Sequence, residues 1–387
     1  MPKPMPFRIA VPDATLERIM ARVRDYDWHE MPAHGGWAYG TNLDYLRELC
    51  AYWTGGFDWR AAEAGLNRFP QFIAEATVEG ETIPVHFIHE KGSGPHARPL
   101  IISHGWPGSF FEFLEVIEPL AHPERFGGSA EDAFDVVVPS LIGYGFSGKP
   151  RNPMGPRRIA AYLGQVMSGV LGYQDYIAQG GDWGSVISAW LGHDDPACAG
   201  VHLNMYGWRS PGVRAETDEE KAAEARAAGA FEAEGAYFRL QMTKPQSLSY
   251  AMMDSPVGVA AWLVEKFNTW SHTDGDNIES AYTKDQLLTN IMIYLVTRTF
   301  NTASWQYRGL FEDRYGTPIP PGQRLEKPTA IANFPFDNFQ WPPRSMVEKS
   351  YNVVRWSDIG EGGHFAALER PARFVEDVRS FGRLLRG

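Results

Sequence analysis

Apolar residues in the first 75 positions recur with the spacing of helices. Two sets follow the i, i+3, i+4, i+7 pattern of one buried helix face. The first set is Leu16, Ile19, Met20 and Val23, and the second is Leu46, Leu49, Cys50 and Trp53. This pattern predicts a mostly helical segment over residues 1–75. Between the two sets, the Gly- and Pro-broken aromatic stretch "YDWHEMPAHGGWAYG" is typical of a wrapping arm.

From about residue 76 the spacing becomes alternating. The stretch "EATVEGETIPVHFIHEKG" alternates apolar and polar residues around a glycine, as a β-hairpin does. Short β-branched runs then alternate with helical segments as far as residue 210, and "TAIANFPFD" and "NVVRWSDIG" continue the pattern later. Strands that alternate with helices predict an α/β fold, with a mostly parallel sheet covered by helices on both faces.

The alternation stops between about 211 and 325. This stretch contains an Ala/Glu-rich run and the segment "TKDQLLTNIMIYLVTRTF", which begins with Thr283 and Gln286 in capping-box spacing. Both features predict helices, which we expect to form a lid over the carboxyl ends of the strands, where ligands bind in such sheets. The expected segments are a lead domain at 1–75, core at 76–210, a helical lid at 211–325 and core at 326–387.

Composition narrows the class of protein. The 387 residues are 44% hydrophobic, with 13 Trp and 22 Phe, which suits a large aromatic-rich core. The net charge of −11 and the lack of a dense basic run argue against nucleic acid or a membrane surface as partners. Two cysteines allow no disulfide framework and no metal-type spacing. The N-terminal stretch lacks the apolar run of a signal peptide or anchor, so we expect a soluble cytoplasmic protein.

Three residues with catalytic chemistry follow predicted strands: Asp182 in "QGGDWGS", Asp337 in "NFPFD" and His364 in "GGHF". Strand ends of a parallel sheet share one edge, so these side chains are expected to converge. Their chain order of nucleophile, acid and histidine is that of the α/β-hydrolase fold, and small residues flank Asp182 as a strained strand-to-helix turn requires. Each residue alone is more simply a cap or loop residue, but their joint occurrence indicates a catalytic group.

The chain resembles epoxide hydrolases of the microsomal type, a branch of the α/β-hydrolase superfamily. The stretches that carry the resemblance are "YWTGGFDWR", "LNRFPQF", "HGWPGSF", "PSLIGYGFS", "QGGDWGS", "DSPVGVAAWLVEKF", "DQLLTN", "NFPFD" and "GGHFAALERP", which span nearly the whole chain. Two departures are visible. Mammalian microsomal members carry an N-terminal membrane anchor that is not found here. Asp337 stands where they tend to have Glu, which bears on the rate of the hydrolytic step.

The resemblance explains an aspartate at the turn. An epoxide is attacked at a saturated carbon, where a serine would leave an ether, whereas Asp182 forms an ester that water can hydrolyse. His364 is expected to activate that water and Asp337 to orient the imidazole. The expected oxyanion donors are the backbone N–H groups of Trp183 and, by resemblance, Trp106, and both tryptophans are expected to contact substrate. Resemblance also implies a cis peptide bond between Trp106 and Pro107.

Family members open the ring with two lid tyrosines, which by resemblance fall on Tyr237 and Tyr307. Tyrosine stays protonated at neutral pH and so suits an acid. The other lid tyrosines, Tyr250, Tyr282 and Tyr294, are interpreted as structural. The resemblance implies no cofactor and no metal, a lipophilic epoxide and water as substrates, and a vicinal diol as product. Detoxification of xenobiotics and natural-product biosynthesis both stay open, as does a homodimer.

Two other functions are consistent with parts of the pattern. Haloalkane dehalogenases share the aspartate nucleophile and bind halide with indole N–H groups, in places such as Trp106 and Trp183. The tyrosine assignments argue against that function. A catalytically silent hydrolase-fold receptor for an apolar ligand has no need of the complete set of Asp182, Asp337 and His364.

Overall fold

The computed structural model describes residues 3–32, 34–312 and 320–386. Over these residues the chain forms a nine-stranded sheet in the order β1-β2-β3-β5-β4-β6-β7-β8-β9. The strands are β1 (Met5–Phe7), β2 (Gln71–Val78), β3 (Glu81–Glu90), β4 (Arg98–Ser103), β5 (Phe134–Pro139), β6 (Tyr176–Gly180), β7 (Cys198–Leu203), β8 (Leu325–Asn333) and β9 (Tyr351–Asp358). Pairing is antiparallel from β1 to β5 and parallel from β5 to β9.

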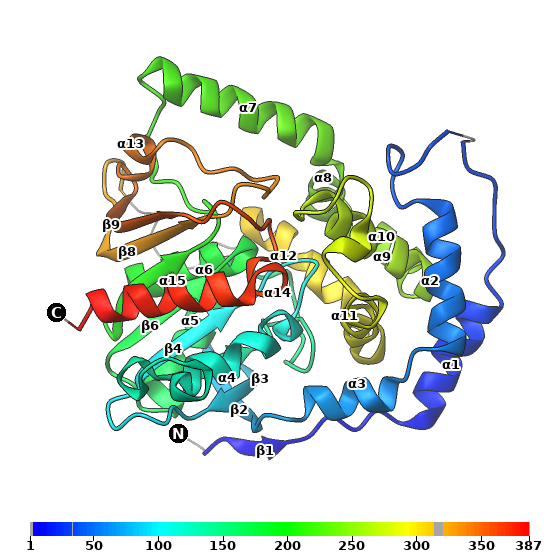
Figure 1. Cartoon of the computed structure of the whole chain (residues 1–387), viewed down its shortest axis with the longest axis horizontal. Helices are drawn as coiled ribbons and strands as arrows, with labels where there is room; N and C mark the ends of the chain where they lie inside the picture. The colour runs from blue at the N-terminus through cyan, green and yellow to red at the C-terminus, as the bar shows by residue number, and fades with distance from the viewer. Residues whose placement is uncertain (1–2, 33, 313–319, 387) are drawn as a thin grey trace.

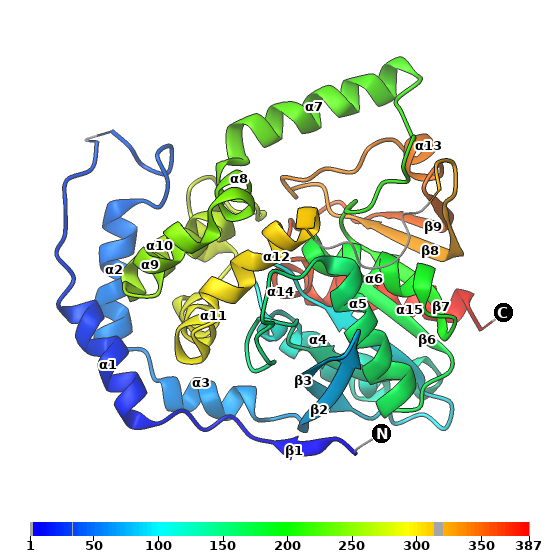
Figure 2. The ribbon, with the colours of Figure 1, turned by 180° about the vertical axis from the view of Figure 1, so that it is seen from behind.

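Helices lie on both faces of the sheet, as the sequence predicts. Helices α4 (Leu114–Ala121) and α15 (Pro371–Leu384) pack together on one face (Figure 1). Helices α5 (Pro156–Gly164) and α6 (Asp182–Asp194) cover the other face, which is seen from behind in Figure 2. Every residue of β5 and β6 is buried, because strands covered on both sides have no solvent-facing positions. The predicted fold class is therefore confirmed.

Over the residues that the structure describes, six α-helices lie between β7 and β8 and form the lid. They are α7 (Asp218–Glu234), α8 (Ala236–Thr243), α9 (Pro245–Met252), α10 (Pro256–Thr269), α11 (Lys284–Thr297) and α12 (Phe300–Glu312). The capping box predicted from Thr283 and Gln286 begins α11, with both of its reciprocal hydrogen bonds present. Part of the stretch expected as lid, residues 313–319, lies outside the described residues.

The lead segment contains α1 (Asp13–Arg24), α2 (Leu43–Gly55) and α3 (Trp59–Leu66), as the helical spacing predicts. Two differences appear. The short strand β1 pairs with β2, and β2 begins at Gln71, before the predicted change at residue 76. The start of β2 was not visible because "RFPQFI" is apolar without alternation. The hairpin of β2 and β3 is confirmed.

The stretch between α1 and α2 passes on the outer side of α2, and its end returns to the lid at α10 (Figure 1). The hydroxyl of Thr41, at its end, donates a hydrogen bond of 2.5 Å to the backbone oxygen of Ala261 in α10. The hydroxyl of Tyr52 in α2 also donates to the carboxylate of Asp285 in α11. The lead segment is thus joined to the lid by polar contacts as well as by helix packing.

The remaining short elements connect the main ones. They are η1 (Phe110–Phe113), η2 (Pro123–Phe126), η3 (Ala130–Asp132), η4 (Gln165–Val170), η5 (Ile278–Ser280), α13 (Arg344–Val347) and α14 (Ala366–Glu369). Of these, η1 matters most for the site, because it directly follows the loop after β4. Both cysteines, Cys50 and Cys198, are buried and free.

Candidate active site

Asp182 stands at the first position of α6, immediately after β6. Its φ of 49° lies in the left-handed region, which a non-glycine residue occupies only at a cost. The turn closes tightly because a Cβ on Gly184 would lie 1.9 Å from the backbone oxygen of Ser103. A Cβ on Gly180 would lie 2.1 Å from the backbone of Gly184. The glycines seen in the sequence are therefore required by the close approach of β4, β6 and α6.

His364 lies between the two carboxylates that the sequence analysis selected. Its Nε2 atom is 3.3 Å from Oδ2 of Asp182, and its Nδ1 atom is 3.1 Å from Oδ1 of Asp337. The side chains of His364 and Asp337 are 2% and 3% exposed, whereas that of Asp182 is 13% exposed. Asp182 is thus the member of this group that remains open to a small ligand.

The two neighbouring carboxylates determine the protonation state of His364. Burial alone lowers the pKa of His364, but the carboxylates of Asp337 and Asp182 raise it well above its usual value. Loss of one of those negative charges would lower the histidine pKa again. The protonation of His364 is therefore coupled to the charge on Asp182.

The loop after β4 supplies a donor to the other oxygen of Asp182. The backbone N–H of Trp106 donates a 2.8 Å hydrogen bond to Oδ1, and the peptide bond to Pro107 is cis, as the resemblance implies. Nearby, His104 accepts a hydrogen bond from the backbone N–H of Leu141, and burial lowers its pKa to about 4. A neutral His104 holds this loop in place without adding charge. The donor role of the Trp183 backbone stays a prediction.

The two predicted tyrosines come together above Asp182 from separate lid helices. Tyr237 of α8 and Tyr307 of α12 have ring centroids 5.9 Å apart, and both are buried. Tyr237 stacks on Trp106 at 5.1 Å, and Tyr307 meets Trp183 edge-on at 4.9 Å. Among the described residues the hydroxyl of Tyr307 makes no well-aligned hydrogen bond, although Tyr237 and Trp183 lie close enough to hydrogen-bond with it. Burial raises the pKa of both tyrosines well above its usual value, as does the nearby charge of Asp182, so both are protonated donors.

A cavity of about 560 Å³ extends from Tyr237 towards the lead segment. Aromatic residues of the stretch between α1 and α2, among them Trp28, Trp37 and Tyr39, line one side. Trp262 of α10 lies on the lid side. Sequence reasoning identified the stretch as a wrapping arm but missed its contribution to a cavity. The sequence feature that could have indicated this cavity was the high density of aromatic residues in a segment without helix or strand spacing.

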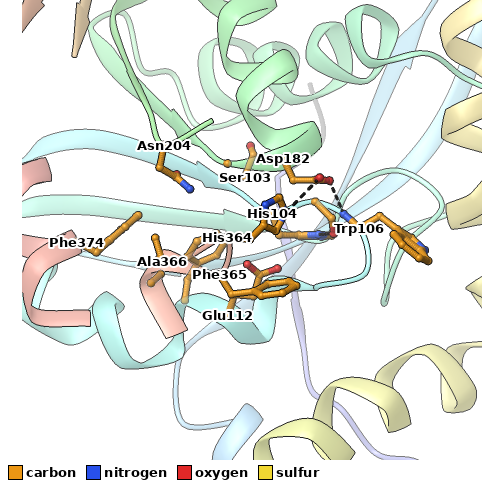
Figure 3. A pocket seen from close by; sticks show the side chains of 14 residues that line it. Ser103, His104, Trp106, Glu112, Asp182, Asn204, His364, Phe365, Ala366 and Phe374 are labelled. Carbon is orange, nitrogen blue, oxygen red and sulfur yellow. Dashed lines mark hydrogen bonds and ion pairs between the residues drawn. The ribbon is translucent and has the colours of Figure 1, made fainter. Parts of the chain in front are cut away.

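A second, much smaller cavity lies at the catalytic group itself. It is lined by Asp182 and His364 together with the loop after β4, and by Glu112 of η1, which the sequence analysis did not select (Figure 3). A glutamate within the aromatic run "FFEF" was the signal that could have drawn attention to it. Among the described residues, no cluster of three or more His, Cys, Asp or Glu is arranged to hold a metal ion.

The sheet, the tight turn and the Asp–His–Asp group define an α/β-hydrolase. Family models agree: the alpha/beta hydrolase fold matches residues 98–322, and the model described as the epoxide hydrolase N terminus matches residues 4–113. No helix in the described part of the chain combines the length and apolar content needed to cross a bilayer.

Comparisons with similar proteins identify the family within the α/β-hydrolases. Epoxide hydrolase 1 of Sus scrofa is 31% identical, covering 98% of this chain and 88% of its own. The solved structure of Aspergillus niger epoxide hydrolase has a TM-score of 0.84 at 30% identity, covering 99% of this chain and 97% of its own. Juvenile hormone epoxide hydrolase of Bombyx mori has a TM-score of 0.82 at 27% identity, covering 99% and 94%. The chain belongs to the epoxide hydrolase family and is a hydrolase enzyme.

Proposed function

We propose that the enzyme converts a lipophilic epoxide to a vicinal diol through a covalent ester on Asp182. The observation that carries this proposal is the unequal environment of the two oxygens of Asp182. Oδ1 accepts the backbone N–H of Trp106, whereas Oδ2 is the oxygen near His364. Oδ2 attacks a ring carbon and the carbon–oxygen bond of the epoxide breaks. Oδ1 becomes the ester carbonyl oxygen, already held by a donor that stabilises a tetrahedral oxyanion.

Ring opening requires an acid, and Tyr237 and Tyr307 are proposed to supply it. An alkoxide that forms at the ring oxygen is much more basic than a phenolate, so a protonated tyrosine transfers or shares its proton readily. The burial of both phenols beside the charge of Asp182 supports this role, because it keeps both hydroxyl groups protonated. The stacking of Tyr237 on Trp106 holds the second phenol above Asp182.

Hydrolysis of the ester is assigned to His364 and Asp337. Ester formation removes the negative charge of Asp182, which lowers the pKa of His364 and makes the neutral base available. His364 then takes a proton from water, and the water oxygen attacks Cγ of Asp182. Asp337 holds the imidazole by its Nδ1 atom and stabilises the positive charge that it acquires.

The proposed substrate class follows from the cavity that reaches Tyr237. Its walls carry the aromatic residues of the arm and Trp262, beside the charged side chains of Glu234, Glu265 and Lys266, and its 560 Å³ accommodates a molecule of drug size. Such walls favour an apolar substituent on the epoxide, since burial of apolar surface contributes about 25 cal/mol per Å². Relatives act on different epoxides according to their names, so xenobiotic and biosynthetic substrates both remain candidates.

His364→Gln tests the covalent step. Alkylation of Asp182 does not need the imidazole as a base, but hydrolysis does. Intact mass after mixing with a styrene-type epoxide is therefore expected to rise by the mass of the epoxide and to stay raised. The double variant with Asp182→Ala is the control and is expected to keep its original mass. An unmodified His364→Gln enzyme that nevertheless binds the epoxide would rule out the ester.

A further inference from the structure

Glu112 lies beside the catalytic group but takes part in none of the steps above. It belongs to η1, and the residue is 9% exposed. Its Oε1 atom is buried and has no hydrogen-bond partner among the described residues. A buried carboxyl oxygen without a partner costs free energy, so the environment lacks something that the carboxyl group would bind.

The loop after β4 makes room for this carboxyl group. A Cβ built on Gly108 would lie 1.6 Å from Oε1 of Glu112. No real side chain tolerates such a contact, so any residue larger than glycine at 108 would displace the carboxyl group. The position of Glu112 therefore depends on Gly108, in the same loop that presents Trp106 to Asp182.

Glu112 shares a cavity with the reacting residues. The cavity of about 10 Å³ is lined by Glu112, His364 and Asp182, among others. That volume, taken as space for the centre of a water molecule, is close to the room that one ordered water needs. In Figure 3 the Glu112 side chain points from η1 towards the group formed by His364 and Asp182.

We propose that this cavity holds the water that hydrolyses the ester, and that Glu112 is a positioning residue that orients it. The inference rests on the covalent mechanism proposed above. One O–H of the water donates to Nε2 of His364, which removes that proton. The other O–H donates to Oε1 of Glu112, so a lone pair of the oxygen is aimed at Cγ of Asp182. The water oxygen bonds to Cγ, the bond from Cγ to the alkyl oxygen breaks, and that oxygen leaves with a proton from His364.

The charge state of Glu112 agrees with this role. Burial raises its pKa to about 8, with the charge of His364 lowering it and that of Asp182 raising it. A neutral carboxyl group adds no third negative charge beside Asp182 and Asp337. Its carbonyl oxygen still accepts a hydrogen bond, so Oε1 serves the water in either protonation state.

Glu112→Leu tests the proposal when alkylation and hydrolysis are measured separately in single turnovers. Hydrolysis is expected to slow by about 10- to 100-fold, the loss that follows from one buried hydrogen bond in a transition state. Alkylation is expected to stay within about twofold, so the alkyl-enzyme accumulates in intact-mass spectra. The control is Glu118→Leu, which changes a 44% exposed glutamate on α4 and is expected to leave both rates unchanged.

Two further variants keep the test decisive if Glu112→Leu does not fold. Glu112→Gln keeps an acceptor oxygen and is expected to hydrolyse within about threefold of wild type. Gly108→Ala keeps the glutamate but displaces its carboxyl group, and is expected to slow hydrolysis selectively. Normal hydrolysis in Gly108→Ala or Glu112→Leu overturns the proposal, and so does an equal loss in both half-reactions. If His364→Gln forms no adduct, the covalent mechanism itself has failed. If His364→Gln does form the adduct, normal hydrolysis in these variants, or an equal loss in both half-reactions, refutes only the role of Glu112.

Discussion

On the core side of the active site the proposed reacting groups follow the ends of strands, whereas on the lid side they lie within helices, Tyr237 in the first turn of α8 and Tyr307 in the interior of α12. Asp182, Asp337 and His364 all follow strands in the parallel part of the sheet. Tyr237 and Tyr307 belong to α8 and α12, which pack against each other above that sheet. The sheet topology alone brings the core groups together, but the tyrosines meet only when two lid helices pack correctly.

The difference teaches which half-reaction each region controls. In the proposed mechanism the core group makes and hydrolyses an ester, and its geometry is held by short contacts to His364 and Trp106. In the same proposal the lid tyrosines protonate the opening ring, and their geometry is held by aromatic packing. Apart from those of Asp182 itself, which remove the nucleophile, substitutions on the core side are therefore expected to act mainly on hydrolysis, and those on the lid side on alkylation.

The largest effect is expected at Asp337, and it tests whether the core side controls hydrolysis. Asp337→Asn is expected to slow hydrolysis by about 10³- to 10⁴-fold, because the imidazole loses its orientation and charge partner. Asp337 raises the pKa of His364, and in the proposed mechanism the neutral imidazole acts as the base. Removing the carboxylate lowers that pKa, so the acidic limb of hydrolysis should move to lower pH. Single-turnover hydrolysis as a function of pH measures both effects.

Asp358→Asn is the matched control, since Asp358 is an exposed residue at the end of β9. It is expected to leave both the rate and the pH profile unchanged. If the acidic limb of the Asp337→Asn profile lies at the same pH as in wild type, Asp337 does not control the pKa of His364.

An intermediate effect is expected on the lid side. Tyr307→Phe and Tyr237→Phe are each expected to slow alkylation by about 10- to 100-fold, because one tyrosine still donates when the other is lost. The double variant should approach the full contribution of a general acid, about 10³- to 10⁴-fold. Quenched-flow mass spectrometry of the alkyl-enzyme measures these rates. Tyr282→Phe, another buried lid tyrosine whose hydroxyl bonds Ser271, should alkylate normally. A loss confined to hydrolysis would contradict the division between core and lid.

The last effect concerns stability and does not act on a catalytic rate. The pKa of Glu112 is raised in the folded protein to about 8, so the folded state holds a proton that the unfolded state releases at lower pH. The stability contributed by that proton is complete below about pH 4.5 and declines as pH rises to about 8, by about 1.4 kcal/mol per pH unit at most. Glu112→Gln removes this titration. Urea unfolding at pH 5, 6.5 and 8 should show wild type losing stability relative to the variant, and parallel curves would contradict it.

Several features were predictable because they depend on local chemistry. The capping box at Thr283 and Gln286 and the glycines around Asp182 encode local geometry, and the structure contains both. The lid tyrosines were predictable only by resemblance, since burial makes a catalytic tyrosine and a packing tyrosine look alike in sequence. Glu112 was missed because its importance depends on Gly108 and on His364, which is more than 250 positions away.

By itself, the sequence determined the alternation of strands and helices, the tight turn at Asp182 and the order of the acidic and basic residues. Those features follow from side-chain periodicity and from backbone sterics, which act between near neighbours. Only the tertiary structure decided how Tyr237 and Tyr307 are brought together and which aromatic residues of the arm line a cavity. It also decided that the carboxyl group of Glu112 lies beside Asp182 and His364. Each of those depends on packing between segments far apart in the chain, where shape and burial decide the contact.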